Sequence, residues 1–414
     1  MSADADPERP DGGQVYEEPG LLDRFVELKQ RQWFLMLGSA LVLLVLPFLM
    51  IDGLSVVSEL LTGTDDFAGY AGLPSLVLVF AIVVIGFDIL LGYTRLLSFG
   101  HAAFFGTAAY AAAIVSEQVA ASPLLMVLLG GLVGTLLALP IGFLSIRRSG
   151  VYFAVLTLTF AQMLFFWARS PGAWLTRGSN GFIPDAELTM LGYRPDTPLT
   201  EALLIPLPEV VFGTVTVEYV LVGGFALLAI FVAYRIVNSP YGLVLEAIGQ
   251  NQQRVNFVGL NVFRYKLMAF VISGAFAAVG GALFAIHEIA VGGGVYPDSL
   301  YWIQSGDFVI MTVLGGVGSI AGPVMGAFVF EYIANVLNGA STTLFTGPLQ
   351  PVLGEFTLNF TPIWRLVLGG VFVLVVAFFP DGIRGALASL ARRLSDRFGE
   401  RGGEPAAASD GGDD

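Results

Sequence analysis

The sequence of 414 residues contains no cysteine, which excludes disulfides, thiolate metal sites, cysteine nucleophiles and thiol redox chemistry. Its two histidines, His101 and His287, lie far apart, so we expect no histidine-based metal site. Its two lysines, Lys29 and Lys266, follow no Gly-x-x-x-x-Gly loop, and the chain therefore carries no phosphate-binding loop of its own. We expect no catalytic residue, no metal and no cofactor in this chain.

Charge is also scarce. Charged residues make up 13% of the chain, hydrophobic residues make up 55%, and the mean hydropathy is +0.77. A soluble protein carries about twice that charged fraction. Apolar runs of about 17–25 residues recur, long enough to cross a bilayer as helices. The first run, from Trp33 to Ile51, follows an acidic leader and not the short basic pattern of a cleaved signal peptide.

We predict an all-α polytopic membrane protein with about ten transmembrane helices. The predicted spans cover residues 32–51, 73–92, 98–116, 123–145, 150–168, 218–237, 266–288, 302–318, 321–338 and 363–379. With the N-terminus inside, most lysines and arginines lie in cytoplasmic segments, as the positive-inside rule requires. The residues left outside are Arg169, Arg177, Arg194 and Arg365. We therefore expect a multi-pass protein of the plasma membrane with both termini in the cytoplasm.

The remaining segments are polar. Residues 1–30 and 391–414 are predicted to be disordered acidic tails around a transmembrane domain at 31–390. Residues 169–217 form a long extracellular loop, which either covers the outer mouth, contacts a soluble partner or is an ordinary ordered loop. The net charge of −13 resembles that of salt-adapted proteins and favours a halophilic origin.

The stretch "SPYGLVLEAIGQNQQRVNFVGLN", residues 239–261, lies between two of the most apolar runs. It cannot span the membrane, because Glu246 and Arg254 alone would cost about 5 kcal/mol at mid-membrane. Ser239 followed by Pro240 is nevertheless a plausible helix start, with serine as the N-cap and proline at the first helical position.

An apolar face with helical spacing supports this prediction. Its members are Val244, Ile248, Val255 and Val258. Gly249 is expected to form an elbow between two short amphipathic helices, and Gly259 to end the second one. Such a segment either lies on membrane lipid or inserts into a protein groove. The groove is favoured because the segment has little charge and no tryptophan anchor.

Several polar residues lie within predicted spans. Asp88 either has a structural role, for example by pairing with Arg95 on the same helical face, or lines the translocation path. His101 is either a structural hydrogen-bonding group or a proton relay. Gln162 and Asp307 either bond between helices or line a polar channel.

Other glycines point to packing. The small residues Gly100, Ala103 and Gly106 allow close helix approach, in either a full span or a re-entrant segment. The stretch "GGVGSIAG", residues 315–322, indicates close helix packing and a tight turn.

Four further stretches are distinctive when taken together: "LLGYTRLLSFGHAAFFGTAAY", "RRSGVYFAVLTLTFAQML", "EAIGQNQQRVNFVGLNVFRYKL" and "VIMTVLGGVGSIAGPVMGAFVFEY" with its continuation. Their combination resembles the membrane subunits of ATP-binding cassette importers, in particular branched-chain amino-acid permeases of the LivM type. The third resembles the cytoplasmic motif through which such permeases contact their ATPases. The chain departs from the pattern at Asp88, Arg95, Gln250 and Gln252, the last two standing at acidic positions of that motif.

The resemblance implies the ABC importer permease fold and a set of partners. These are a sister permease subunit in a heterodimer, two ATP-binding cassette subunits that hold ATP and magnesium, an extracellular substrate-binding protein and membrane lipid, with no nucleic acid. Residues 238–265 become the cytoplasmic coupling segment. Its expected ATPase-docking residues are Glu246, Ala247, Gly249, Gln250, Arg254 and Gly259.

The implied function is uptake of branched-chain amino acids, in which ATPase closure drives alternating access. A urea or short-amide importer is the nearest alternative, because those permeases resemble the chain over the same stretch. An ion-coupled secondary transporter would need clustered intramembrane ion ligands, and Asp88, Asp307 and Glu331 are scattered. A membrane enzyme would need catalytic groups gathered at one depth, which the sequence does not show.

Overall fold

The structure is a computed structural model that describes residues 37–43, 45–47, 49–53, 72–185, 187–189, 192–198, 201, 215–339, 363–379, 382–386 and 389. The chain divides into two units, Met1–Leu44 and Val45–Asp414. In the first unit the described residues, 37–43, are helical. The predicted tails, 1–30 and 391–414, lie outside the described residues, so the division into tails and a domain at 31–390 stays a prediction.

The second unit is built of helices. Its principal elements are α3 (Leu73–Asp88), α4 (His101–Gln118), α5 (Pro123–Ser145), α6 (Val151–Arg169), α10 (Val217–Val237), α11 (Pro240–Phe257), α12 (Val262–Ala290), α13 (Trp302–Gly315), α14 (Ala321–Gly339) and α16 (Trp364–Phe378). Short elements are η1 (Leu49–Gly53), η2 (Ile89–Tyr93), α7 (Ala173–Thr176), η3 (Gly178–Asn180) and η4 (Pro297–Leu300). In the described residues, β-structure is limited to isolated bridges. The predicted all-α polytopic class is confirmed.

The predicted spans agree closely with the observed helices. The helix α5 has the predicted bounds, and α12 begins at Val262, four residues before its predicted start at 266. Five helices are long and apolar enough to cross a membrane: α3 continued by η2, α5, α6, α10 and α12. The predicted span at 98–116 corresponds to one helix of 18 residues, α4, which begins at His101 and ends at Gln118. Such a helix is about 27 Å long, close to the thickness of the hydrocarbon core.

Burial separates inner helices from outer ones. In their most apolar windows, α3 with η2 is 83% buried and α12 is 72% buried, whereas α6 is only 28% buried. Small residues permit this packing. A Cβ atom on Gly281 of α12 would strike the carbonyl oxygen of Phe105 in α4, and one on Gly134 of α5 would lie 2.7 Å from the Cβ of Ala278 in α12. The backbones of α4, α5 and α12 therefore approach one another where glycine leaves room.

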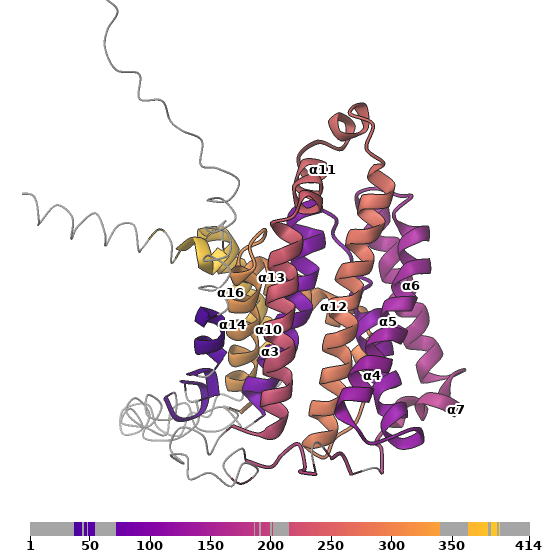
Figure 1. Ribbon diagram of the computed structural model, residues 1–414, viewed down its shortest axis with the longest axis vertical. Coiled ribbons are helices and arrows are strands. Elements are labelled where there is room, and N and C mark those ends of the chain that lie inside the picture. Colours follow the sequence, from indigo (N-terminus) through magenta and orange to yellow (C-terminus); the bar gives the residue numbers. More distant parts are fainter. Residues whose placement is uncertain are drawn as a thin grey trace, which may run out of the picture. The chain divides into compact units, whose positions relative to one another are not determined.

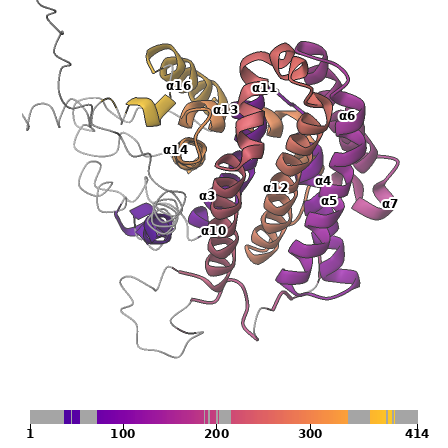
Figure 2. The same cartoon turned by 45° about the horizontal axis from the view of Figure 1, so that its top comes forward.

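The helices have two ends that matter for function (Figure 1). We call the end at which α11 lies the inner end, because the charge distribution predicts it to be cytoplasmic, and the opposite end the outer end. Several basic residues lie within or next to the helix ends at this inner end: Arg95, Arg147, Arg148, Arg235 and Lys266. The turned view in Figure 2 shows α13, α14 and α16 on one side of α3 and α10, and α5 and α6 beyond α12 on the other.

Candidate coupling site

The helix α11 begins as its sequence predicts. The side chain of Ser239 accepts a hydrogen bond from the backbone N–H of Gly242 at 3.3 Å, and Pro240 occupies the first helical position. A serine N-cap satisfies one of the free N–H groups of the first turn, and proline has no N–H to leave unpaired. The polar segment between two apolar spans is therefore a helix with a defined start at the inner end (Figure 1).

A break divides α11 into two parts, but it does not lie at Gly249. Asn251 has φ −157° and ψ 97°, which is extended backbone within an otherwise helical segment. The side chain of Asn251 then accepts a hydrogen bond from the N–H of Arg254 at 3.1 Å and so caps the second part. The predicted elbow therefore lies two residues later than expected, at Asn251, because the asparagine side chain caps the new helical turn. Gly249 instead makes a close contact with Tyr93.

The break also changes which residues face inward. Ile248 and Val255 are buried as predicted and pack with Val262, the first residue of α12. Val244 is only partly buried, and Val258 is 80% exposed, which contradicts its predicted place on the apolar face. The predicted apolar face assumed one continuous helix. The non-helical residue Asn251 changes the direction in which the residues after it point, so the spacing no longer places Val258 on that face.

Two polar contacts fasten α11 to the start of α12. The hydroxyl of Tyr241 donates to the carbonyl oxygen of Tyr265 at 3.1 Å, and the two rings stack at 5.7 Å. Burial raises the pKa of the Tyr241 hydroxyl, which keeps it a donor. In the second part of α11, Lys266 Nζ donates to Gln252 Oε1 at 2.6 Å. Both parts of α11 are thus held against α12.

Gly249 brings α11 into close contact with the inner end of α3. A Cβ atom at Gly249 would strike the carbonyl oxygen of Tyr93, the last residue of η2. It would also lie 3.6 Å from Cγ of Arg95. Any side chain at Gly249 would therefore push α11 away from the inner end of α3. Gly259 has a different role, since its φ of +88° follows the end of α11 at Phe257 and confirms the predicted stop.

The inner end of α3 is joined in turn to the turn between α13 and α14. Asp88 Oδ1 accepts a hydrogen bond from the N–H of Gly318 at 2.8 Å, and the hydroxyl of Tyr93 donates to the carbonyl oxygen of Gly318 at 3.4 Å. Gly318 has a φ of +81°, and the predicted tight turn at 315–322 is confirmed. Residues from three separate stretches of sequence therefore meet at this end.

The predicted pair of Asp88 with Arg95 is absent from the ion pairs of the described residues. The helix widens to a π-helical turn at Ile89–Tyr93 and then ends, and Arg95 has a φ of +55° and an exposed side chain. A spacing of seven residues places two side chains on one face only where the helix continues. Asp88 instead accepts the hydrogen bond from the Gly318 N–H, which agrees with the structural role that the sequence allows for it.

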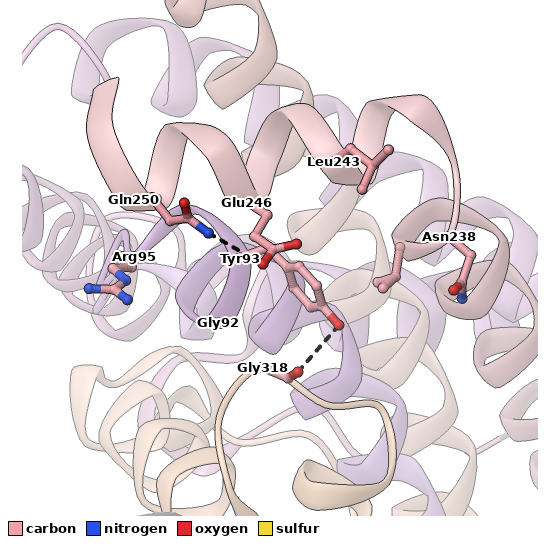
Figure 3. A pocket seen from close by; sticks show the side chains of 10 residues that line it. Gly92, Tyr93, Arg95, Asn238, Leu243, Glu246, Gln250 and Gly318 are labelled. Carbon is pink, nitrogen blue, oxygen red and sulfur yellow. Dashed lines mark hydrogen bonds between the residues drawn. The ribbon is translucent and has the colours of Figure 1, made fainter. Parts of the chain in front are cut away.

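These residues enclose a cavity of about 510 Å³ between α11, η2 and the 316–319 turn. Figure 3 shows Glu246 and Gln250 projecting from α11 toward Tyr93, with Gly318 on the far side of Tyr93 and Arg95 at one edge. Gln250 Nε2 donates to Glu246 Oε1 at 3.5 Å. The lining residues are Gly92, Tyr93, Arg95, Val237, Asn238, Leu243, Glu246, Gly249, Gln250 and Gly318.

A second, shallower groove runs along α11 on its exposed side. It has a volume of about 480 Å³, and its lining residues are Ala247, Gln250, Asn251, Arg254, Val255, Val258 and Leu260. Phe257, next to this groove, is 89% exposed. An exposed aromatic ring and valine at the tip of a polar helix form a surface suited to a protein partner. The expected docking residues thus fall into two groups. Glu246 and Gly249 line the cavity that faces α3, and Ala247 and Arg254 line the exposed groove of α11. Gln250 lines both the cavity and the groove.

The other predicted site residues lie away from this region. His101 is fully buried, with Nε2 at 2.8 Å from Ser273 Oγ and Nδ1 at 3.1 Å from Ser98 Oγ, which agrees with a structural hydrogen-bonding role. Gln162 of α6 has a buried Oε1 without a hydrogen-bond partner among the described residues. Asp307 lies in a separate cavity. A place on the translocation path stays a prediction for all of them and for Asp88.

Sequence reasoning did not identify Tyr93 or Gly318 as part of the site. Tyr93 stands in "LLGYTR" at the end of a predicted span, and Gly318 stands in the predicted turn. Their positions at helix ends near the same membrane face were the available signals. The contacts between these residues depend on the π-helical turn and on the fold.

Comparison with known proteins agrees with this architecture. Residues 70–376 match the family described as the branched-chain amino acid transport system / permease component. The high-affinity branched-chain amino acid transport system permease protein LivM of Salmonella typhimurium is 27% identical over 289 residues, which is 67% of this chain and 60% of that protein. The Escherichia coli protein of that name is 25% identical over 332 residues, 78% of this chain and 70% of that protein.

More distant similarity extends to the autoinducer 2 import system permease protein LsrC of Escherichia coli, which is 24% identical over 271 residues, 64% of this chain and 71% of that protein. No solved structure matches the chain. The region matched to the Salmonella protein thus spans less than two thirds of that protein's length.

The apolar helices and the polar helix α11 at their inner end are those of a multi-pass membrane protein. The chain belongs to the branched-chain amino acid transport system permease component family, and as such it is a multi-pass plasma-membrane permease.

Proposed function

We propose that this chain is the membrane-spanning subunit of an ATP-driven importer of branched-chain amino acids, and that α11 transmits ATPase closure to the spans. The contact of Gly249 with the Tyr93 carbonyl carries this proposal, because it is the place where the polar helix meets the buried helix α3. A partner that binds the exposed groove of α11 and displaces this helix would therefore move α3 directly.

The path of the displacement continues beyond α3. Tyr93 and Asp88 both hydrogen-bond to Gly318, so α13 and α14 would move with the inner end of α3. Packed helices shift as rigid bodies because close-packed interiors do not deform continuously. Lys266 and Tyr241 hold α11 to α12 at the same time. ATPase closure would therefore rock α3, α12, α13 and α14 and so alternate access from one side to the other.

The energy source lies outside this chain in the proposal. The chain has no phosphate-binding loop, and α11 offers an exposed groove with Phe257 at its tip. Two ATP-binding cassette subunits with ATP and magnesium would occupy that face. A sister permease would complete a heterodimer in the lipid, and an extracellular binding protein would deliver the cargo.

The substrate class follows from the relatives. Their printed names specify branched-chain amino acids for LivM and autoinducer 2 for LsrC. We favour the branched-chain amino acids because the LivM similarity is higher and extends over more of this chain. Autoinducer 2 is the second candidate, since the LsrC match covers 64% of the chain.

Co-purification combined with transport tests this proposal. The chain is tagged in its native cell and solubilised gently, and the complex is reconstituted in proteoliposomes with the binding protein that is encoded alongside it. We expect two ATPase subunits and a second permease in the complex, and uptake of leucine, isoleucine or valine that requires ATP.

Urea and autoinducer 2 are assayed in parallel as alternative cargoes. Uptake of either in place of leucine would overturn the substrate assignment alone. Leucine uptake without any ATPase, driven by an ion gradient, would overturn the coupling mechanism.

A further inference from the structure

A cavity of about 470 Å³ opens at the outer end of the bundle, opposite α11. It lies between the end of α12, the turn η4 and the starts of α13 and α16. The lining residues are Phe284, Glu288, Gly294, Tyr296, Asp298, Ser299, Tyr301, Ile303, Gln304, Asp307 and Arg365. These residues come from four separate elements, so the fold alone brings them together.

The wall of the cavity is held by backbone hydrogen bonds. Phe182, after α6, and Val295, after α12, form an antiparallel bridge with N···O distances of 2.7 and 2.9 Å. The N–H of Gly293 donates to the carbonyl oxygen of Glu288 at 2.7 Å. The segment that carries Tyr296 and Asp298 is therefore fixed between the outer loop and α12.

Residues with charges of both signs line this cavity. Asp307 and Arg365 line the same space and interact electrostatically, yet they form no direct ion pair among those of the described residues. The guanidinium of Arg365 lies 5.0 Å from the centre of the Trp364 ring, which orients it. A charged ligand that bridges the two groups would satisfy both.

A buried hydroxyl lacks a partner nearby. The hydroxyl of Tyr110 in α4 makes no hydrogen bond in the described part of the chain, and Tyr110 is only 4% exposed. It interacts electrostatically with Asp298 of the cavity wall. A buried hydroxyl without a hydrogen bond is costly. This one lies on α4, which packs against η4 in the cavity wall.

A metal ion does not suit this arrangement. Within the described residues, no three carboxylate or histidine side chains are placed to share an ion. The cavity instead is lined by the carboxylate of Asp307, by the exposed Arg365 and by the apolar side chains of Phe284 and Ile303. An α-amino acid carries an ammonium and a carboxylate on one carbon with the side chain beside them, and these three features match.

We propose that this outer cavity is a subsite that receives the zwitterionic head of an aliphatic amino acid, with the ammonium at Asp307, the carboxylate at Arg365 and the side chain against Phe284 and Ile303. The proposal rests on the proposed function and names the residues of this chain that recognise the cargo. Glu288 and Asp298 add negative charge around the ammonium. Recognition of both charged groups would exclude amines and fatty acids of the same shape.

The absence of cysteine allows a direct test. Ile303→Cys would place the only thiol of this subunit in the cavity wall, and Val291→Cys would place one on an exposed position at the same end. Both are introduced into the complete complex, and labelling of the subunit by a maleimide is followed with and without leucine. Only the unoccupied fraction reacts, so leucine at about ten times its dissociation constant should slow labelling of Ile303→Cys about tenfold.

Analogues and variants define the specificity. Isopentylamine and 4-methylpentanoate each retain one charge of leucine and should not protect Ile303→Cys. Asp307→Asn and Arg365→Gln should each abolish protection by leucine. The matched changes Asp196→Asn and Arg194→Gln alter an exposed pair, 3.3 Å apart, in the outer loop and should leave protection intact. A labelling rate without leucine equal to that of Ile303→Cys alone shows that the cavity of each variant is intact.

The outcomes separate this proposal from the proposed function. If the parent complex takes up no leucine, the proposed function fails and the subsite fails with it. If the parent complex takes up leucine but leucine protects neither Ile303→Cys nor a second probe, Tyr296→Cys, the subsite alone is wrong. Protection that persists in Asp307→Asn and Arg365→Gln, or that both analogues reproduce, would also overturn it.

Discussion

Asp88 of α3 accepts a hydrogen bond of 2.8 Å from the backbone N–H of Gly318, in the turn that joins α13 to α14. Tyr93, just over one helical turn further along, donates to the carbonyl oxygen of the same glycine and offers its own carbonyl to the close approach of Gly249. One short stretch at the inner end of α3 therefore contacts both the polar helix α11 and the turn between two other spans.

The role of Asp88 is testable because aspartate, asparagine and alanine differ in what they can accept. Asp88→Ala would leave the N–H of Gly318 without its partner at a cost of about 1–3 kcal/mol. Asp88→Asn retains a carbonyl oxygen that can accept the same bond. We expect the alanine complex to unfold at a lower temperature and to transport less, and the asparagine complex to resemble the parent in thermal unfolding and in leucine uptake.

An opposite result would assign Asp88 to the translocation path. If the asparagine complex unfolds at the parent temperature but takes up no leucine, the negative charge itself is required. Asp88 would then act on the cargo, which is the second role that the sequence analysis allows for it.

Gln252 should be important for α11 because it is the hydrogen-bond partner of Lys266. Gln252→Ala removes that partner of a largely buried ammonium, which costs about 1.5–3 kcal/mol. Gln252→Glu would replace the bond with an ion pair. We expect faster amide hydrogen exchange in the second part of α11 for the alanine variant and parent-like or slower exchange for the glutamate variant.

Gln253 provides the control, since its side chain is exposed. Gln253→Ala should leave exchange unchanged. Equal exchange in the Gln252→Ala and Gln253→Ala complexes would show that the bond to Lys266 contributes nothing to the position of α11.

The orientation in the membrane can be checked with single cysteines, because the native chain has none. Gln253→Cys lies on exposed α11 and Asp196→Cys lies on the exposed outer loop. A maleimide that cannot cross membranes should label Asp196→Cys in intact cells and Gln253→Cys only after the cells are opened. Labelling of Gln253→Cys in intact cells would place α11 outside and exclude any contact with an ATPase.

Hydropathy and charge were sufficient to predict most of the membrane helices. The bounds of α5 followed from an apolar run that ends at polar residues on both sides, and the start of α11 followed from serine before proline. These features depend on a few neighbouring residues, and local sequence therefore determines them.

The details of the candidate site were less predictable. The π-helical turn at Ile89–Tyr93 and its contacts with Gly318 join separate parts of the sequence. The exposure of Val258 follows from the break at Asn251, which the apolar periodicity did not reveal. The expected pair of Asp88 and Arg95 failed because it assumed a helix that continues. Asp307 was a candidate from its sequence alone, but only the fold brings Arg365 into the same cavity.

The most direct measurement of coupling is the amount of leucine taken up per ATP hydrolysed by reconstituted complexes that carry Gly249→Leu. The added side chain would strike the Tyr93 carbonyl, whereas Gly224→Ala in α10 adds a methyl group where nothing lies within 4 Å and serves as the control. We predict that the ratio falls by about tenfold in Gly249→Leu, equivalent to about 1.4 kcal/mol of coupling free energy, and stays unchanged in Gly224→Ala. A parent-like ratio in a folded Gly249→Leu complex would contradict transmission through this contact.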